Sequence, residues 1–151
     1  MTELNTDADK EEFRTWYTAL LGDTVQEMIK AGVVIGIAIE ARPVWAAPGE
    51  ILIAQVWNAS NKSEFVWTIS GEKFATDHIT GSLATAPREA ARHFALKWQV
   101  DADHLLNLIK NKAPDEKTEE QMQGQATELT QYAESLYELT NLEDIWEQEL
   151  V

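Results

Sequence analysis

Residues 51–70, ILIAQVWNASNKSEFVWTIS, decide the fold because they contain two expected strands and the turn that joins them. ILIAQVWN is apolar on both faces, which is typical of a central strand. EFVWTIS alternates, with Phe65, Trp67 and Ile69 on one side, and predicts a strand with one buried face and one wetter face. The intervening NASNKS, residues 58–63, has the composition of a turn. The stretch therefore predicts two neighbouring antiparallel strands.

A third strand is expected before this pair. VVIGIAIEA, residues 33–41, alternates so that four apolar side chains share one face: Val33, Ile35, Ile37 and Ile39. PVWAAPGE, residues 43–50, contains two prolines and a glycine and predicts an ordered loop between strands. Residues 71–86 have no strong period and are expected to be irregular. The prediction is a three-stranded antiparallel meander.

Helical periodicity lies on both sides of the meander. Apolar side chains recur at spacings of three and four from residue 13 to residue 29, and Gly32 marks the expected end of this helix. A second helix is expected from Pro87 to residue 112, with Thr85 as its cap. A third is expected to begin near Thr118. TNLE, residues 140–143, has the pattern of a capping box and predicts a short final helix over residues 141–149.

These elements define an α+β fold class: an N-terminal helix, a three-stranded antiparallel meander, and then three helices packed on one face of the sheet. The length of 151 residues fits a single domain over residues 1–151. Within it, residues 1–6 are expected to be a disordered leader. Residues 113–151 form an acidic helical C-terminal part.

The formal net charge of -14 is unevenly distributed. Residues 113–151 carry eleven acidic side chains and one basic side chain, whereas residues 40–112 carry eight of each. Such a field repels nucleic-acid phosphates, so direct binding of DNA or RNA is not expected. It attracts a basic protein, although acidic surfaces also serve solubility alone.

The composition also limits the cellular setting. The chain has no cysteine, which excludes disulfides and thiolate chemistry. MTELNTDADKEEF lacks the basic start and apolar core of a secretion signal. The longest apolar run, residues 31–39, is far shorter than the ~20 residues that span a membrane. We expect a cytoplasmic protein without membrane contact.

Asp77 and His78 are the residues that most resemble a chemical site. A carboxylate beside an imidazole can act as a general base or a metal-ligand pair. The alternative is turn chemistry, in which Asp77 caps a turn and His78 bonds to the backbone. The other histidines, His93 and His104, lie ~16 Å apart along one expected helix and cannot share an ion. We expect no metal, no cofactor and no catalytic set.

Three further residues are candidates for binding. Arg88 and Arg92 are four apart on one helix face and, with His78, could meet an anion; the alternative is pairing with Glu89 or the acidic C-terminal helix. Trp45 lies in an expected loop, unlike the other five tryptophans, which fall on apolar faces. An exposed tryptophan there would be a binding hot spot, unless it folds back over the sheet.

VWTISGEKFATDHIT, followed by APREAARHFALKWQVDADHL, resembles the core of a family of short bacterial proteins known only as a domain of unknown function. The resemblance covers about a quarter of the chain. It rests on a Val-Trp…Ser-Gly turn, a Thr-Asp-His segment and an Arg-His-Phe-x-Leu-x-Trp-Gln helix, which are here Val66, Trp67, Ser70, Gly71, Thr76, Asp77, His78, Arg92, His93, Phe94, Leu96, Trp98 and Gln99. It implies no activity, substrate or cofactor.

Three functions remain open at this point. The leading hypothesis is a non-catalytic protein-interaction module that uses the acidic helical face, with or without Trp45, to bind a basic or apolar protein patch. The second is a small enzyme or ligand-binding domain with a pocket around residues 76–93, in which His78 is base or ligand, Asp77 orients it, and Arg88 or Arg92 meets an anion. The third is an immunity-type or nucleic-acid-mimic inhibitor.

Overall fold

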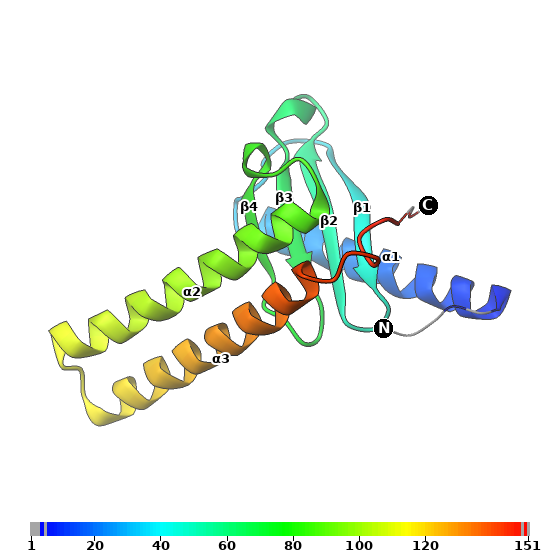
Figure 1. The fold of residues 1–151 in the computed structure, drawn as a ribbon. Helices are drawn as coiled ribbons and strands as arrows, with labels where there is room; N and C mark the ends of the chain where they lie inside the picture. Colours follow the sequence, from blue (N-terminus) through cyan, green and yellow to red (C-terminus); the bar gives the residue numbers. More distant parts are fainter. Residues whose placement is uncertain (1–3, 5, 149, 151) are drawn as a thin grey trace.

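The computed structural model describes residues 4, 6–148 and 150. Its helices and strands are α1 (Asp7–Lys30), β1 (Ile39–Ala47), β2 (Ile51–Asn58), β3 (Val66–Ser70), β4 (Asp77–Thr80), α2 (Pro87–Lys112) and α3 (Glu116–Thr140), with short 3-10 helices at Lys62–Glu64 and Gly81–Leu83 (Figure 1). The fold is α+β, as predicted. Of the expected leader, residues 1–6, only Leu4 and Thr6 lie among the described residues, and Thr6 caps α1 by accepting from the N–H of Asp9.

The sheet is an antiparallel meander in the order β1-β2-β3-β4. The prediction for residues 51–70 is confirmed, because β2 and β3 pair antiparallel and Ile53 lies opposite Ile69. The strand β2 is buried along most of its length, as its two-sided apolar pattern requires.

The prediction of three strands is wrong, because the described residues contain a fourth, β4, at the edge of the sheet. It falls in the segment that was expected to be irregular. With four residues, of which only Ile79 is a buried hydrophobe, β4 is too short to show a period in the sequence.

The first strand is displaced along the chain from its predicted position. Gly32, with φ of 74°, follows the end of α1. The N–H of Val33 donates to the carbonyl of Met28, so Val33 belongs to the helix end and not to a strand. The strand β1 begins at Ile39 and runs through PVWAA, which was expected to be a loop. Pro43 is tolerated there because β1 is an edge strand and its register shifts between Pro43 and Trp45.

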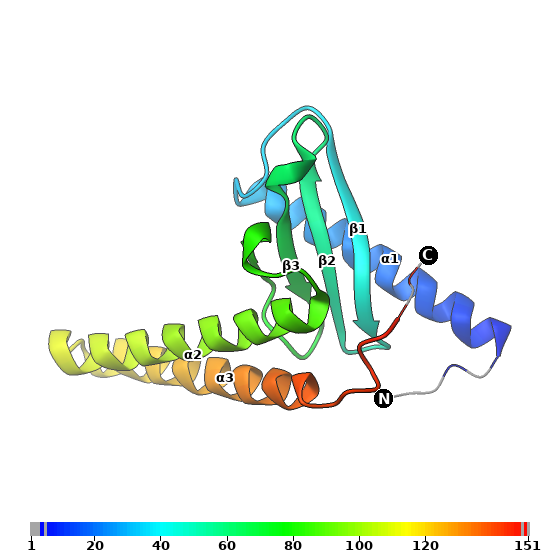
Figure 2. The same ribbon diagram turned by 45° about the horizontal axis from the view of Figure 1, so that its top comes forward.

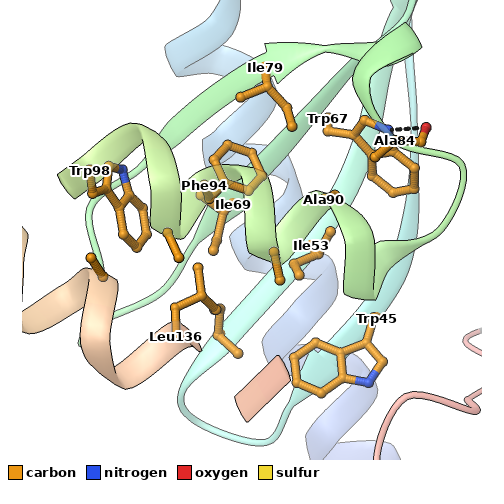
Figure 3. Packing of buried hydrophobic residues seen from close by; sticks show 14 of the residues in the cluster. Trp45, Ile53, Trp67, Ile69, Ile79, Ala84, Ala90, Phe94, Trp98 and Leu136 are labelled. Carbon is orange, nitrogen blue, oxygen red and sulfur yellow. Dashed lines mark hydrogen bonds between the residues drawn. The ribbon is translucent and has the colours of Figure 1, made fainter. Parts of the chain in front are cut away.

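Helices cover both faces of the sheet, not one (Figures 1 and 2). On one face α2 packs a large apolar cluster that includes Trp67, Phe94 and Trp98 (Figure 3). On the other face Tyr17 and Met28 of α1 pack against β1 and β2. The expected wetter face is consequently buried. Its polar members have partners there: Ser70 accepts from the hydroxyl of Thr24 in α1 at 2.9 Å, and Thr68 donates to the carbonyl of Ala54 at 3.5 Å.

The helices α2 and α3 lie side by side and project beyond the sheet (Figures 1 and 2). Their buried residues lie only near the sheet, from Ala90 to Ala102 in α2 and from Ala126 to Thr140 in α3. We call residues 103–125 the helical arm. It contains no fully buried side chain.

The prediction of a final helix over residues 141–149 is wrong for the described residues 141–148, which are irregular. We call residues 141–148 the C-terminal segment. Residue 149 lies outside the described residues. Thr140 does not start a new helix but ends α3, where its hydroxyl donates to the carbonyl of Tyr137. Hydrogen bonds from two tryptophans hold the segment in place instead. Trp146 donates to the carbonyl of Leu139 at 2.9 Å, and Trp45 donates to the carbonyl of Ile145 at 2.7 Å.

Candidate functional site

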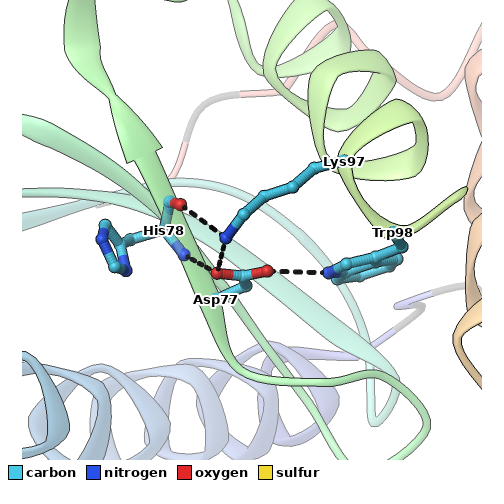
Figure 4. Close-up of polar contacts among 4 residues, drawn as sticks. All are labelled: Asp77, His78, Lys97 and Trp98. Atoms are coloured by element: carbon cyan, nitrogen blue, oxygen red, sulfur yellow. Dashed lines mark hydrogen bonds and ion pairs between the residues drawn. The ribbon is translucent and has the colours of Figure 1, made fainter. Parts of the chain in front are cut away.

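Asp77 connects the edge strand to the helix that covers it. One carboxylate oxygen accepts from the backbone N–H of His78 at 2.8 Å and pairs with the ammonium of Lys97. The other accepts from the indole N–H of Trp98 at 2.9 Å (Figure 4). Trp98 is fully buried, so its N–H would have no water to bind if the carboxylate were absent. Asp77 is thus a polar clamp between β4 and α2.

The same clamp covers the free edge of β4 at His78. Gly81 donates to the carbonyl of Phe65, and Ile79 lies opposite Trp67, so residues 77, 79 and 81 direct their backbone groups toward β3. The backbone groups of His78 then point to the open edge. Its N–H is taken by Asp77, and its carbonyl lies 3.5 Å from the Lys97 ammonium. Edge strands that lack such protection pair with other chains.

The His78 imidazole points away from the carboxylate of Asp77, as Figure 4 shows. In this arrangement Asp77 bonds to the backbone N–H of His78 and does not orient its imidazole as a base. His78 is also one of the residues around an open hollow of about 440 Å³ between β4 and α2, which His93 and Lys97 line too. Neither Arg88 nor Arg92 lines this hollow. No group of three or more His, Asp or Glu side chains in the described part of the chain could hold a metal ion.

Arg88 and Arg92 hold the end of α3. The guanidinium of Arg88 donates to the carbonyl of Thr140 at 2.8 Å, and that of Arg92 donates to the same oxygen at 3.3 Å. Cations are favoured at this position because the last carbonyls of a helix carry a partial negative charge. The alternative interpretation had these arginines pair with the C-terminal helix. They do contact it, through a backbone carbonyl. Glu89 accepts from Thr85, so Thr85 does not cap α2 with its own oxygen.

Trp45 lies in β1 with 0% of its surface exposed, so the expectation of a loop tryptophan is wrong. Its ring stacks on that of Trp146 at a centroid distance of 4.2 Å. Beside it, the amide of Gln148 accepts from the N–H of Ala46 at 3.0 Å and donates to the carbonyl of the same residue at 2.9 Å. The C-terminal segment thereby covers the edge of β1 at Ala46. Trp45 is one of the residues that hold it, and offers no open surface to a partner.

The acidic face of α3 is the remaining candidate. Four glutamates share one stripe, because Glu116 and Glu134 are eighteen residues, or five full turns, apart and Glu120 and Glu138 each follow four residues later. All four are exposed, on the side of α3 away from Ala126, Ala133 and Leu136. The ion pairs among the described residues are Lys73–Glu50 and Lys97–Asp77, so none of these glutamates has a basic partner there.

Two pKa shifts fall on α3. The N–H and hydroxyl of Thr118 hydrogen-bond to the carboxylate of Asp115, the residue that caps α3, and lower the pKa of Asp115. The Tyr132 hydroxyl bonds to Glu128, and this contact raises the pKa of Tyr132. Both are local consequences of helix geometry and neither adds a catalytic group.

The architecture defines a small α+β domain in which a four-stranded antiparallel meander lies between one helix and a projecting helical hairpin. The chain belongs to a family described as a domain of unknown function, DUF4826, whose model matches residues 11–146. No curated protein and no solved structure matches the chain. No helix within the described residues has both the length and the apolar character needed to cross a membrane.

Proposed function

We propose that the protein is a non-catalytic interaction module that binds a basic protein through the acidic face of α3. The observation that carries the proposal is the stripe of Glu116, Glu120, Glu134 and Glu138, exposed and without basic partners among the described residues. Unpaired like charges on one helix face repel each other and are relieved when a cationic surface approaches.

The structural contacts of the other candidate residues support the assignment of the interaction surface to α3. Asp77 holds β4 to α2, Arg88 and Arg92 hold the end of α3, and Trp45 holds the C-terminal segment. Each of these side chains thus already has a structural contact, whereas Glu116, Glu120, Glu134 and Glu138 form no ion pair among the described residues.

Mimicry of nucleic acid is the less favoured form of the same idea. A mimic needs acids at regular intervals along its face, but Glu120 and Glu134 are about 21 Å apart along the helix axis. Glu128 lies between them and is turned about 100° from the middle of the stripe. The gap fits a partner with two basic patches better than a continuous phosphate-binding cleft.

The test is a pull-down with the wild-type protein and a variant in which Glu116, Glu120, Glu134 and Glu138 are all lysine. The matched control reverses four exposed acids of α1, Glu11, Glu12, Asp23 and Glu27, and so makes the same change in net charge. We expect one basic protein to bind wild type and control and to be lost from the α3 variant. Binding should weaken at about 0.5 M salt, where the Debye length is roughly 4 Å.

Retention of every partner by the α3 variant would contradict the proposal. A partner that is lost equally from the α1 control would show a dependence on net charge alone. Competition by duplex DNA for the bound protein would move the assignment to nucleic-acid mimicry.

A further inference from the structure

The hollow between β4 and α2 is separate from the acidic face of α3. The residues that line it come from β4, from the 3-10 turn after β4, and from the side of α2 next to β4: His78, Ile79, Thr80, Leu83, His93, Leu96, Lys97 and Val100. Its volume of about 440 Å³ lies within the ~300–1,000 Å³ of typical small-molecule sites.

The apolar part of the hollow is unusually open to solvent. Leu83 is 46% exposed, and Leu96 and Val100 are each 57% exposed. Leu96 and Val100 are four residues apart and therefore neighbours on α2, on the side away from buried Phe94 and Trp98. Single exposed apolar side chains are common, but three around one hollow mark a place where an apolar group can be covered.

The polar part of the hollow is cationic or neutral. His78, His93, Lys97 and Thr80 line it, and no carboxylate does, although the chain has 26 acidic residues. The ion pair with Asp77, which does not itself line the hollow, neutralises part of the charge of Lys97. The Lys97 ammonium has three N–H groups and directs two of them to Asp77 and the His78 carbonyl, which leaves the third for a ligand.

The contacts of the His78 backbone limit how a ligand can bind. Because the N–H and carbonyl of His78 are already bonded, an incoming peptide strand cannot add to the sheet at this residue. A ligand must be held by side chains instead. Apolar side chains beside hydrogen-bond donors, with no acid among them, suit a molecule that has an aliphatic body and an anionic head.

We propose that this hollow binds a small amphipathic carboxylate. The aliphatic chain covers Leu83, Leu96 and Val100, and the carboxylate accepts hydrogen bonds from Lys97 and from the imidazole of His93. This binding is independent of the acidic face of α3, so either assignment can fail without the other.

The test compares three probes with the same ten-carbon tail and different heads: decanoate, decanol and decyltrimethylammonium, each used below its micellar concentration. Binding is followed by NMR through the amide and imidazole resonances of the hollow. We expect decanoate to bind best, with shifts confined to residues 78–83 and 93–100. Equal or tighter binding of either other probe, or the absence of decanoate binding, would overturn the proposal.

Two variants locate the site. Leu96→Glu places a like charge in the hollow and should weaken decanoate binding by at least about tenfold. Leu106→Glu is the matched control, since Leu106 is 47% exposed on the same helix but lies outside the hollow, and it should bind as wild type does. Unchanged binding by Leu96→Glu would overturn the assignment. Tighter binding of a short acidic, leucine-containing peptide than of decanoate would assign the hollow to a protein segment instead.

Discussion

The two ends of the helical hairpin are built from the same helices, yet they are held in different ways. Near the sheet, α2 buries six side chains and α3 buries four. In the helical arm, residues 103–125, the apolar stripes continue through Leu105, Ile109 and Met122, but these are only half-buried because no third layer covers them. An amphipathic stripe in the sequence therefore predicts a helix, while its burial depends on what else reaches that face.

Truncating a buried side chain at the sheet end and truncating an exposed one in the arm should differ most in their effect on stability. Phe94→Ala removes a ring with 0% exposure from the central cluster and should lower the free energy of unfolding by about 3–5 kcal/mol. Leu106→Ala, at 47% exposure in the arm, should lower it by less than about 1 kcal/mol. Urea denaturation of both variants tests this. Equal losses would mean that the arm is packed more tightly than its exposure indicates.

The Asp77 clamp should give the next largest effect. Asp77→Ala leaves the buried indole N–H of Trp98 without an acceptor and should reduce stability by about 1–3 kcal/mol. Asp77→Asn keeps an oxygen that can accept and should recover part of the loss. The free energies of unfolding of the two variants, compared by urea titration, are the measurement. If Asp77→Ala unfolded like wild type, Asp77 would be free for a role other than holding α2.

Replacing a helix glycine by alanine should give the smallest change in stability. It also tests most directly whether the arm and the sheet end unfold separately. At Gly22 in α1 and at Gly124 in the arm, a methyl group on the Cα would meet nothing within 4 Å, so alanine should fit at both positions. Each change should stabilise its helix by up to about 1 kcal/mol. Gly22→Ala should raise the global free energy of unfolding. Gly124→Ala should mainly slow amide hydrogen exchange in residues 103–125, because we expect the arm to open before the sheet does. An equal global gain from both would show that arm and sheet unfold together.

Local patterns predicted the elements whose signals lie within the element itself. The apolar run of β2, the alternation of β3 and the stripe of α2 all appear where the sequence placed them. The start of β1 was misplaced because the alternation of Ile35 and Ile37 is real, yet both side chains are highly exposed in the connection that follows α1. Periodicity alone does not distinguish an extended connection from a paired strand.

The sequence indicated which residues could form a site, but not which partners they contact in the fold. The Asp77–His78 pair stands out in the sequence, but the partners that decide its role, Lys97 and Trp98, lie twenty and twenty-one residues further along. The bond between Gln148 and Ala46 spans 102 residues and has no local signal at all. The exposed apolar positions of the hollow, Leu96 and Val100, could have been noticed as apolar residues opposite the stripe of α2.

The separation of Ala46 and Gln148 in the sequence also means that β1 is synthesised well before the segment that contacts its edge. The edge strand β1 and the ring of Trp45 leave the ribosome about a hundred residues before the side chains that cover them. At 5–20 residues per second, that interval lasts roughly 5–20 seconds, during which the edge is open to other chains. The nascent chain therefore passes through a stage in which Trp45 and the backbone of Ala46 are uncovered, and this stage ends only when residues 145–148 emerge.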